Sequence, residues 1–317
     1  MKEALLKISN LLILLENQVS DIGLIEGKMG VAIFLYHSSR VLKSKVYEDA
    51  ADNILDTVFG GFNSYVDTSF TNGLSGIGYG LNHLIKYKFI DADPDDLFID
   101  VDNKIFSTLE SNTHNFGGNT PLFLGIYIFD RLNNLDENPI FKSIFVRCKN
   151  FCESTYNEKF QFDEKTLLYL NSILYFLISI HEKGYYNKTI ELLIYNILVG
   201  LIDSINKNTD FTSNILVTIS LLSRIDICST LSAELKNKVE KMLLNKEQHN
   251  KKGIDIELIL QQLLFLETKI EIDLVELNLW MEEKLNTILE QNINTLSKEL
   301  SIIGLSIIRN NRAELLS

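Results

Sequence analysis

Apolar residues in this chain recur every three or four positions, which is the spacing of one face of a helix. Strict alternation over the length of a strand is rare, and the one Asn-Gly pair, Asn72-Gly73, opens a glycine-rich run rather than a hairpin turn. Only 3 prolines interrupt the chain, and proline breaks helix interiors. The pattern therefore predicts an all-α protein. Its clearest instance is Lys43–Phe59, where the apolar face consists of Val46, Tyr47, Ala50, Ala51, Ile54, Leu55 and Val58.

Glycine-rich turns recur along the first part of the chain. They begin at Gly27, Gly73 and Gly117, and each leads into a run of apolar residues. The step between them is about 45 residues, which is typical of a repeated helix pair. Continued at this step, the apolar helix starts lack the glycines and fall at Thr166, Ser213, Ile256 and Ser301. The sequence therefore predicts about seven units.

Amphipathic segments lie between these apolar helix starts. A helix that is apolar all round has to be buried, whereas an amphipathic helix faces water on one side. Two layers satisfy both requirements, with apolar helices inside and amphipathic helices outside. We therefore expect one domain over residues 1–317, an α/α toroid (barrel) of about seven helix hairpins. The amphipathic segments are Lys43–Val58, Asp95–Leu109, Ile140–Cys152, Asn187–Ile205 and Ala233–Leu244.

Composition narrows the cellular setting. The chain has 317 residues, 46% of them apolar, and a formal net charge of −12, which disfavours nucleic acid or an anionic membrane as a partner. Three cysteines are too few for a disulfide scaffold. The most apolar stretch, Leu167–Ile180, is shorter than the roughly 20 residues of a membrane span, and the N-terminus lacks a signal-peptide pattern. We expect a cytoplasmic protein with no membrane span.

Two segments carry a resemblance to a known family. Residues 23–37, GLIEGKMGVAIFLYH, and residues 72–85, NGLSGIGYGLNHLI, followed by the acidic turn Asp91–Asp96, are similar to the lanthionine synthetase C-like family. The resemblance is clear in the first three units and follows only the period in the rest. It implies an α/α toroid of seven helix pairs, in agreement with the spacing. It also implies lanthionine cyclase activity, in which zinc binds a peptide cysteine thiolate that adds to a dehydroamino acid.

The zinc ligands that the resemblance implies are absent at the expected places. They would be a Cys in the fifth glycine-rich turn and a Cys-His pair in the sixth. The fifth turn, Asn208–Asn214, and the sixth, Asn250–Glu257, contain neither residue type. We therefore predict no zinc cofactor and no zinc-dependent cyclase activity. Cys148 and Cys152 could form half of another metal site at i, i+4 spacing, but they fit better as small buried hydrophobic residues, and no further ligand is near in sequence; Cys228 also falls beside an expected outer helix.

Polar residues at the starts of the apolar helices are candidates for a binding site. The helix starts would share one end of the ring, where unpaired N–H groups favour anions or polar ligands. The same residues could instead be ordinary helix caps, and the glycines of the turns could serve only close packing. His114 lies just before the third turn, and the other histidines are scattered. The candidate ligands are Glu26, Lys28, Asn72, His114, Asn119, Asp210 and Asp255, and the turn glycines are Gly27, Gly30, Gly73, Gly76, Gly117 and Gly118.

Two functions from different classes remain open. The first is a pseudoenzyme that binds a precursor peptide, or a protein of a modification or secretion pathway, in lanthipeptide-type maturation. The second is an active enzyme, either a peptide cyclase without zinc or a carbohydrate-type toroid enzyme that uses carboxylates and His114 at the glycine-turn end. The first is the prediction favoured by the missing zinc ligands.

Overall fold

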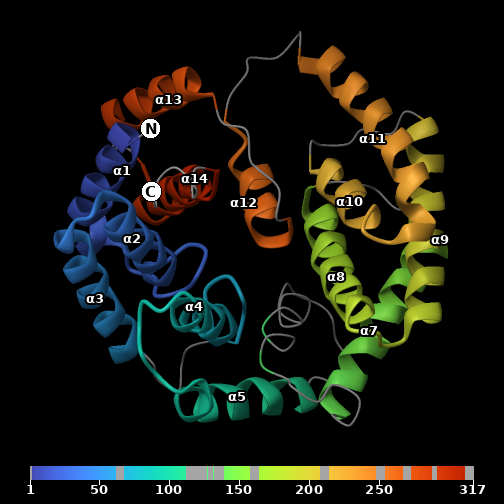
Figure 1. Cartoon of the computed structure of the whole chain (residues 1–317), viewed down its shortest axis with the longest axis horizontal. Helices are drawn as coiled ribbons and strands as arrows, with labels where there is room; N and C mark the ends of the chain where they lie inside the picture. The colour runs from blue at the N-terminus through green and yellow to red at the C-terminus, as the bar shows by residue number, and fades with distance from the viewer. Residues whose placement is uncertain are drawn as a thin grey trace. The chain divides into compact units, whose positions relative to one another are not determined.

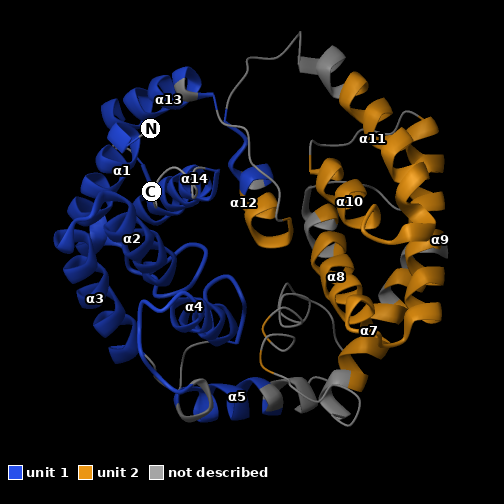
Figure 2. Ribbon diagram, in the orientation of Figure 1, with its two compact units in different colours: residues 1–116, 253–259, 268–317 blue, residues 117–252, 260–267 orange. Residues whose placement is uncertain are grey.

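The computed structural model describes residues 2–61, 68–111, 127, 131, 139–157, 164–207, 214–247, 254–266, 273–287 and 291–310. Every regular element within these ranges is a helix (Figure 1). The chain divides into two compact units: residues 1–116, 253–259 and 268–317 form unit 1, and residues 117–252 and 260–267 form unit 2 (Figure 2). The expectation of a single domain over residues 1–317 stays a prediction.

Unit 1 combines both ends of the chain. Its helix α2 (Lys28–Leu42) is buried on nearly all sides and contacts its neighbours α1, α3, α4 and α14. Helix α3 (Lys45–Gly60) buries only one face, through residues such as Tyr47, Ile54 and Val58. This is the predicted division into apolar inner and amphipathic outer helices. The remaining elements are α1 (Lys2–Leu15), η1 (Glu16–Gln18), α4 (Leu74–Lys86), α5 (Pro94–Ser111), α13 (Leu274–Asn286), α14 (Ile293–Asn310) and the first part of α12 (Ile256–Phe265).

The inner helices α14, α2 and α4 of unit 1 run parallel. Before α2, Ser20 N–H donates to Asn294 Oδ1 at 3.1 Å at the start of α14, and further along α2 the Phe34 ring lies where a Cβ on Gly304 would be. The rings of His37 and His83 likewise meet near the C-terminal ends of α2 and α4. The starts of these three helices therefore lie at one end of the unit, as the repeat predicts.

Unit 2 has the same two kinds of helix. Helix α8 (Glu164–Glu182) is apolar and buried along most of its second half, and the short α10 (Ile215–Leu222) is buried over most of its length. Helix α9 (Asn187–Asn206) buries one face, through Ile190, Leu193, Ile197 and similar residues. The unit also contains α7 (Pro139–Asn157), α11 (Asp226–Glu247) and the second part of α12.

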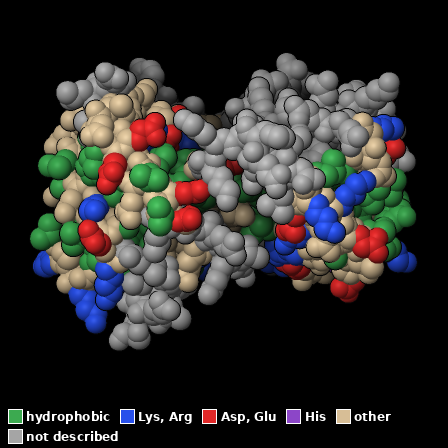
Figure 3. Space-filling model, turned by 90° about the horizontal axis from the view of Figure 1, so that it is seen from above, with side chains coloured by type: hydrophobic (Ala, Val, Ile, Leu, Met, Phe, Trp, Pro, Cys, Tyr) green, Lys and Arg blue, Asp and Glu red, His purple; other side chains and the backbone are tan. Residues whose placement is uncertain are grey.

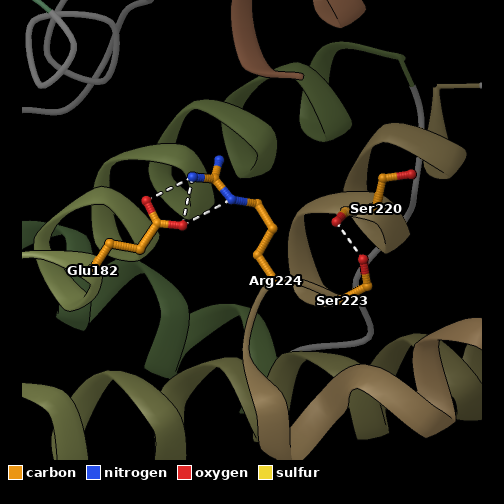
Figure 4. Close-up of polar contacts among 4 residues, drawn as sticks. All are labelled: Glu182, Ser220, Ser223 and Arg224. Atoms are coloured by element: carbon orange, nitrogen blue, oxygen red, sulfur yellow. Dashed lines mark hydrogen bonds and ion pairs between the residues drawn. The ribbon is translucent and has the colours of Figure 1, made fainter. Parts of the chain in front are cut away.

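Ion pairs join the ends of the inner helices of unit 2. Arg224, in the turn after α10, donates from Nε and Nη2 to Glu182 at the end of α8, with Nη2 2.6 Å from each carboxylate oxygen (Figure 4). Beside it, Ser223 Oγ donates to Ser220 O at 2.7 Å. A bidentate guanidinium–carboxylate pair fixes orientation as well as distance. It therefore holds α8 and α10 side by side at their C-terminal ends.

Most predicted helices agree closely with the observed ones in the described ranges, but two starts were wrong: the segment predicted at Ala233–Leu244 is α11, which begins at Asp226, and the start of the last apolar helix also differs. The prediction of Asn187–Ile205 corresponds to α9 at Asn187–Asn206. The last apolar helix was expected to start at Ser301, but α14 begins eight residues earlier at Ile293. The reason is a cap that the apolar pattern does not contain, because Asn292 Oδ1 accepts from the Thr295 N–H at 3.2 Å. Residues 122–126, the start of the third apolar helix, lie outside the described ranges.

One described helix is long and apolar enough to cross a membrane by length and composition alone. It is α9, of which 39% of the relevant window is buried within the protein. The core helix of a protein with no membrane contact passes the same test. The stretch that the sequence indicated as most apolar, Leu167–Ile180, belongs instead to the buried α8.

Candidate functional site

The first glycine-rich turn folds back on the start of α2 and uses its free N–H groups. Lys28 N–H donates to Asp21 O at 2.9 Å, and Met29 N–H donates to Gly23 O at 3.1 Å. The turn is itself fixed by Gly23 N–H, which donates to Asp21 Oδ1 at 2.7 Å. The donors that a helix start normally leaves open are therefore partly occupied here. This start is less suited to anion binding than the sequence suggested.

The turn glycines allow close contact between the first and second turns. A Cβ on Gly23 would lie 2.3 Å from Asn72 Cα, and a Cβ on Gly76 would lie 1.9 Å from Phe70 O. A Cβ on Gly27 would lie 2.4 Å from a backbone atom of the same turn, and a Cβ on Gly30 would lie 2.2 Å from one. These separations are far below van der Waals contact, so only glycine fits. Of the two interpretations of these glycines, the geometry favours close packing.

The candidate ligands of unit 1 each have a separate environment. Glu26 Oε1 lies 3.5 Å from Lys298 Nζ on α14, and Lys28 Nζ donates to the backbone oxygen of Glu16 at 3.1 Å. Asn72 N–H is bound to Ser69 Oγ, whereas its side-chain Oδ1 is buried without a hydrogen-bond partner among the described residues. Asn72 thus keeps an acceptor available at the glycine-turn end, and Glu26 and Lys28 tie neighbouring segments together. Gly73 accepts the Ile77 N–H at 3.1 Å as the N-cap of α4.

The other candidates are a helix cap or lie beyond the described chain. Asp255 Oδ1 accepts the Leu258 N–H at 2.9 Å at the start of α12, which is capping geometry. The remaining predicted site and turn residues lie outside the described ranges: His114, Gly117, Gly118, Asn119 and Asp210.

Two histidines that the sequence left scattered form a pair. His37 Nε2 on α2 and His83 Nε2 on α4 lie 2.8 Å apart, and the ring centroids lie 5.1 Å apart. Since the centroids are farther apart than the nitrogens by about twice the ring radius, the two nitrogens point at each other, as in an N–H···N hydrogen bond. A zinc ion, with bonds of roughly 2.0 Å to each nitrogen, does not fit between them. The signal in the sequence was the separation of the two histidines, which equals the repeat.

Aromatic and basic groups surround this histidine pair. The Tyr87 ring centroid lies 4.4 Å from that of His83, and the Phe89 centroid lies 4.8 Å from that of His37. Arg40 stacks on Phe89 at 3.5 Å and donates to the backbone oxygens of Tyr87 and Lys88. The cluster lies at the C-terminal ends of α2 and α4, away from the glycine turns. Its rings pack between two helices, and the hydrogen bond between the two histidines lies within this contact.

Unit 2 contains a buried polar cluster that sequence reasoning missed. Asn171 Nδ2 on α8 donates to Gln261 Oε1 on α12 at 2.6 Å, and Thr218 Oγ1 on α10 donates to Asn171 Oδ1 at 2.7 Å. All three residues are completely buried. They occupy the second or nearby turn of three apolar helices, separated by about one repeat along the chain. A polar residue at this interval within otherwise apolar helices was the available signal.

The polar cluster is not fully satisfied within the described part of the chain. Gln261 Nε2 has no partner there, and neither polar atom of the Asn214 side chain has one, although Asn214 is completely buried at the N-cap of α10. Buried amides without partners cost stability, and ordered water commonly supplies the missing bonds. The cluster offers neutral donors and acceptors. It contains no thiol, imidazole or carboxylate, the groups that bind zinc.

The cysteines do not supply metal ligands either. Cys148 and Cys152 are buried on α7, and Cys228 is buried on α11. Burial raises the pKa of the Cys148 thiol to about 12, and burial followed by the nearby Cys148 raises the pKa of Cys152 further. Burial therefore favours the neutral, protonated form of these thiols. Among the described residues, no three side chains of His, Cys, Asp or Glu are grouped to hold a metal ion.

Comparison with known proteins agrees with the resemblance seen in the sequence. Residues 18–89 match the model of the family described as lanthionine synthetase C-like protein. Among solved structures, nisin cyclase is similar over 100% of this chain and 98% of its own, with a TM-score of 0.59 and 16% identity. No curated protein matches the chain. These findings confirm the expected resemblance to the lanthionine synthetase C-like family and the expected all-α fold, an α/α toroid.

Proposed function

We propose that this protein is a peptide-binding relative of the lanthionine cyclases that acts in lanthipeptide-type maturation in the cytoplasm without zinc chemistry. The observation that carries the proposal is that the chain has the fold of a lanthionine cyclase but lacks the Cys and His residues expected as zinc ligands. The family match covers residues 18–89, where the two glycine turns are packed together, and the whole chain has the fold of nisin cyclase. The Cys and the Cys-His pair that the family resemblance implies as zinc ligands are missing from the sequence of the fifth and sixth turns.

The residues in question do not fit a zinc ion. The fifth turn ends at Asn214, whose amide is fully buried, and the side chains of the neighbouring helix turns are amides and a hydroxyl. Neutral amide oxygens are poor ligands for zinc, which selects thiolate, imidazole and carboxylate. The three cysteine thiols are buried elsewhere on outer helices, with pKa values raised by burial. No catalytic step through zinc follows from this donor set.

A peptide is the class of partner supported best. Nisin cyclase, to judge by its name, acts on a peptide, and a chain that keeps its fold while lacking its metal ligands can keep peptide binding. The three free cysteines fit a reducing compartment.

Binding can be tested by calorimetry on the full-length protein. The titrant is a leader-bearing precursor peptide with its serines and threonines already dehydrated. We expect a saturable heat, and the absence of any heat up to millimolar peptide, which is a Kd weaker than roughly 1 mM, would overturn the proposal of peptide binding.

The lack of cyclase activity is tested in the same tube. Ring formation consumes the peptide thiol without changing the peptide mass, so it is followed by alkylation of the remaining thiol with iodoacetamide. We expect the peptide thiol to remain fully alkylatable after incubation with the protein, with and without added zinc. Loss of alkylation above a protein-free control would show an active cyclase, which is the alternative function.

A further inference from the structure

The outer helices α1 and α13 of unit 1 form a pocket of about 320 Å³. Glu3, Ala4 and Lys7 line it from α1, and Asn278, Met281, Glu282 and Leu285 line it from α13. Met281 and Ala4 are buried and form an apolar floor, while the charged residues stand at the rim. A smaller cavity next to it is lined by Leu11, Leu296 and Leu300, so the floor continues as an apolar surface toward α14.

Exposed apolar side chains extend this pocket along both helices. Leu14 on α1 is 72% exposed, and Val275 and Leu279 on α13 are 68% and 62% exposed. Leu14 shares the helix stripe of Lys7, and Val275 shares the stripe of Glu282, because each pair is seven residues apart. We call the pocket and these three residues the α1–α13 surface. Exposed apolar side chains beside a pocket are typical of an interaction site.

Acidic groups outnumber basic ones at the rim of the pocket, where Glu3 and Glu282 lie with Lys7. Over Leu274–Asn286, α13 carries Glu276, Glu282 and Glu283 against a single base, Lys284. That base is occupied, since Lys284 Nζ lies 2.7 Å from Glu299 Oε2. Lys7 is likewise paired with Glu3 at 3.2 Å. Glu282 forms no ion pair within the described part of the chain. On the face of unit 1 seen in Figure 3, apolar side chains lie among acidic and basic ones.

We propose that the α1–α13 surface binds a basic amphipathic helix of a peptide partner, with its apolar side chains in the pocket and its Lys or Arg residues at the acidic rim. An amphipathic helix presents apolar residues at i, i+3, i+4 and i+7, which suits a groove between two helices. Charge complementarity selects a basic partner over an acidic one. A second copy of this chain is disfavoured, because its net charge is −12 and it would bring acidic groups against acidic groups. The inference rests on the proposed peptide-binding function and locates it.

The chain provides its own probe for this surface. Trp280 is the only tryptophan of the protein, and it lies on α13 next to Met281, with Lys284 Nζ 5.3 Å from the ring centre. The emission of Trp280 therefore reports on α13 and on no other helix. We expect a tryptophan-free peptide that binds to the α1–α13 surface to change this emission, because Trp280 adjoins Met281 of the pocket floor.

The experiment titrates the full-length protein with a fluorescein-free, tryptophan-free peptide of Leu and Lys, about 18 residues long, with Leu at helical spacing. Trp280 emission is recorded, and the same peptide carrying fluorescein is followed by anisotropy in parallel. A peptide of identical composition in alternating order and a Leu/Glu peptide of the same pattern serve as controls. We expect saturable binding of the helical Leu/Lys peptide only, with a shift of Trp280 emission.

Two substitutions on the exposed face of α13 test the residues. Glu282→Lys and Leu279→Asp are each expected to weaken binding about tenfold or more, because one reverses the rim charge and the other removes exposed apolar area. Glu240→Lys on α11 and Leu192→Asp on α9 make the same changes at exposed positions of unit 2 and are expected to leave binding unchanged. Circular dichroism verifies that each variant stays folded.

The outcomes separate this inference from the proposed function. If the precursor peptide binds by calorimetry but Trp280 emission and the α13 variants show no response, the surface is wrong and the proposed function stands. Equal binding of the Leu/Lys peptide in alternating order would also overturn the inference, since it would show attraction by charge alone. A stable dimer by light scattering that Glu282→Lys or Leu279→Asp dissociates would assign the surface to a second copy of this chain. If no precursor binds at all, the proposed function itself fails.

Discussion

The inner helices of unit 1 and those of unit 2 are joined by different chemistry. In unit 1 the turn glycines let backbones touch, as at Gly76 and Phe70 O, and Gly304 accommodates the Phe34 ring. In unit 2 the corresponding level of α8, α10 and α12 has no glycine and is bridged by Asn171, Thr218 and Gln261. Glycine contacts cannot be replaced by another residue, whereas amide contacts can. The family match at residues 18–89 lies within unit 1, whereas the fold likeness covers the whole chain.

The largest expected effect comes from filling a glycine contact of unit 1. Gly76→Ala places a methyl group against the backbone oxygen of Phe70, which cannot move without shifting the second turn. We expect a loss of about 3 kcal/mol in the free energy of unfolding, the upper end of the usual cost of overpacking, measured by urea denaturation. The matched control is Gly200→Ala in α9 of unit 2, where nothing lies within 4 Å of the added Cβ. Gly200→Ala should raise the free energy of unfolding by about 0.5–1 kcal/mol. Equal effects at both positions would contradict the difference between the two units.

The second-largest effect is expected from a substitution that breaks the polar cluster of unit 2. Asn171→Leu leaves Gln261 Oε1 and Thr218 Oγ1 buried without partners, which costs about 2–3 kcal/mol. Asn171→Leu combined with Thr218→Val and Gln261→Leu removes all the orphaned groups together. Because replacing every partner by an apolar group of similar shape can be nearly neutral, the triple variant should unfold at higher urea than the single one. If the triple variant loses the sum of its parts, the cluster is not a connected network.

The third prediction concerns the histidine pair of unit 1. His37→Leu or His83→Leu alone leaves the other Nε2 without its 2.8 Å partner, at a cost of about 1 kcal/mol. The double variant should cost less than the sum, with a coupling energy of about 1 kcal/mol in a double-mutant cycle. Additive effects would mean that the two rings are packed together without a hydrogen bond.

The smallest effect is expected at the ion pair between Arg224 and Glu182. Both side chains are partly exposed, at 33% and 46%, so the pair is screened by solvent. Glu182→Gln should cost about 0.5 kcal/mol, and the cost should fall further in high salt. A loss that is larger and independent of salt would show that this pair contributes more than the buried amides to holding α8 and α10 together.

Much of the fold could be predicted because it depends on helical periodicity. The apolar spacing of residues 43–59 and the Asn187–Ile205 segment predicted α3 and α9 within two residues of their ends. The start of α14 was wrong, since it is set by the Asn292 cap rather than by apolar residues. Capping depends on local hydrogen bonds, which a periodic pattern does not encode.

The candidate site was predicted less completely because it depends on contacts between helices. The sequence indicated polar residues at helix starts, and the structure places Glu26 and Lys28 in contacts with other segments and Asp255 at a cap. The sequence analysis did not predict the contact of His37 with His83 or of Asn171 with Gln261, although the residues of each pair are separated by about one or two repeats. Pairing needs the register of parallel helices, which becomes known only when the helices are packed.

The central claim is that the fold of a lanthionine cyclase is kept here without its zinc site. It is tested most directly by elemental analysis of the full-length protein, purified without chelators and dialysed against zinc-containing and then zinc-free buffer. We expect zinc far below one ion per chain, because no three side chains of His, Cys, Asp or Glu are grouped among the described residues and the polar cluster of unit 2 consists of amides and a hydroxyl. One tightly held zinc ion per chain would contradict it, because the donor set would then be complete.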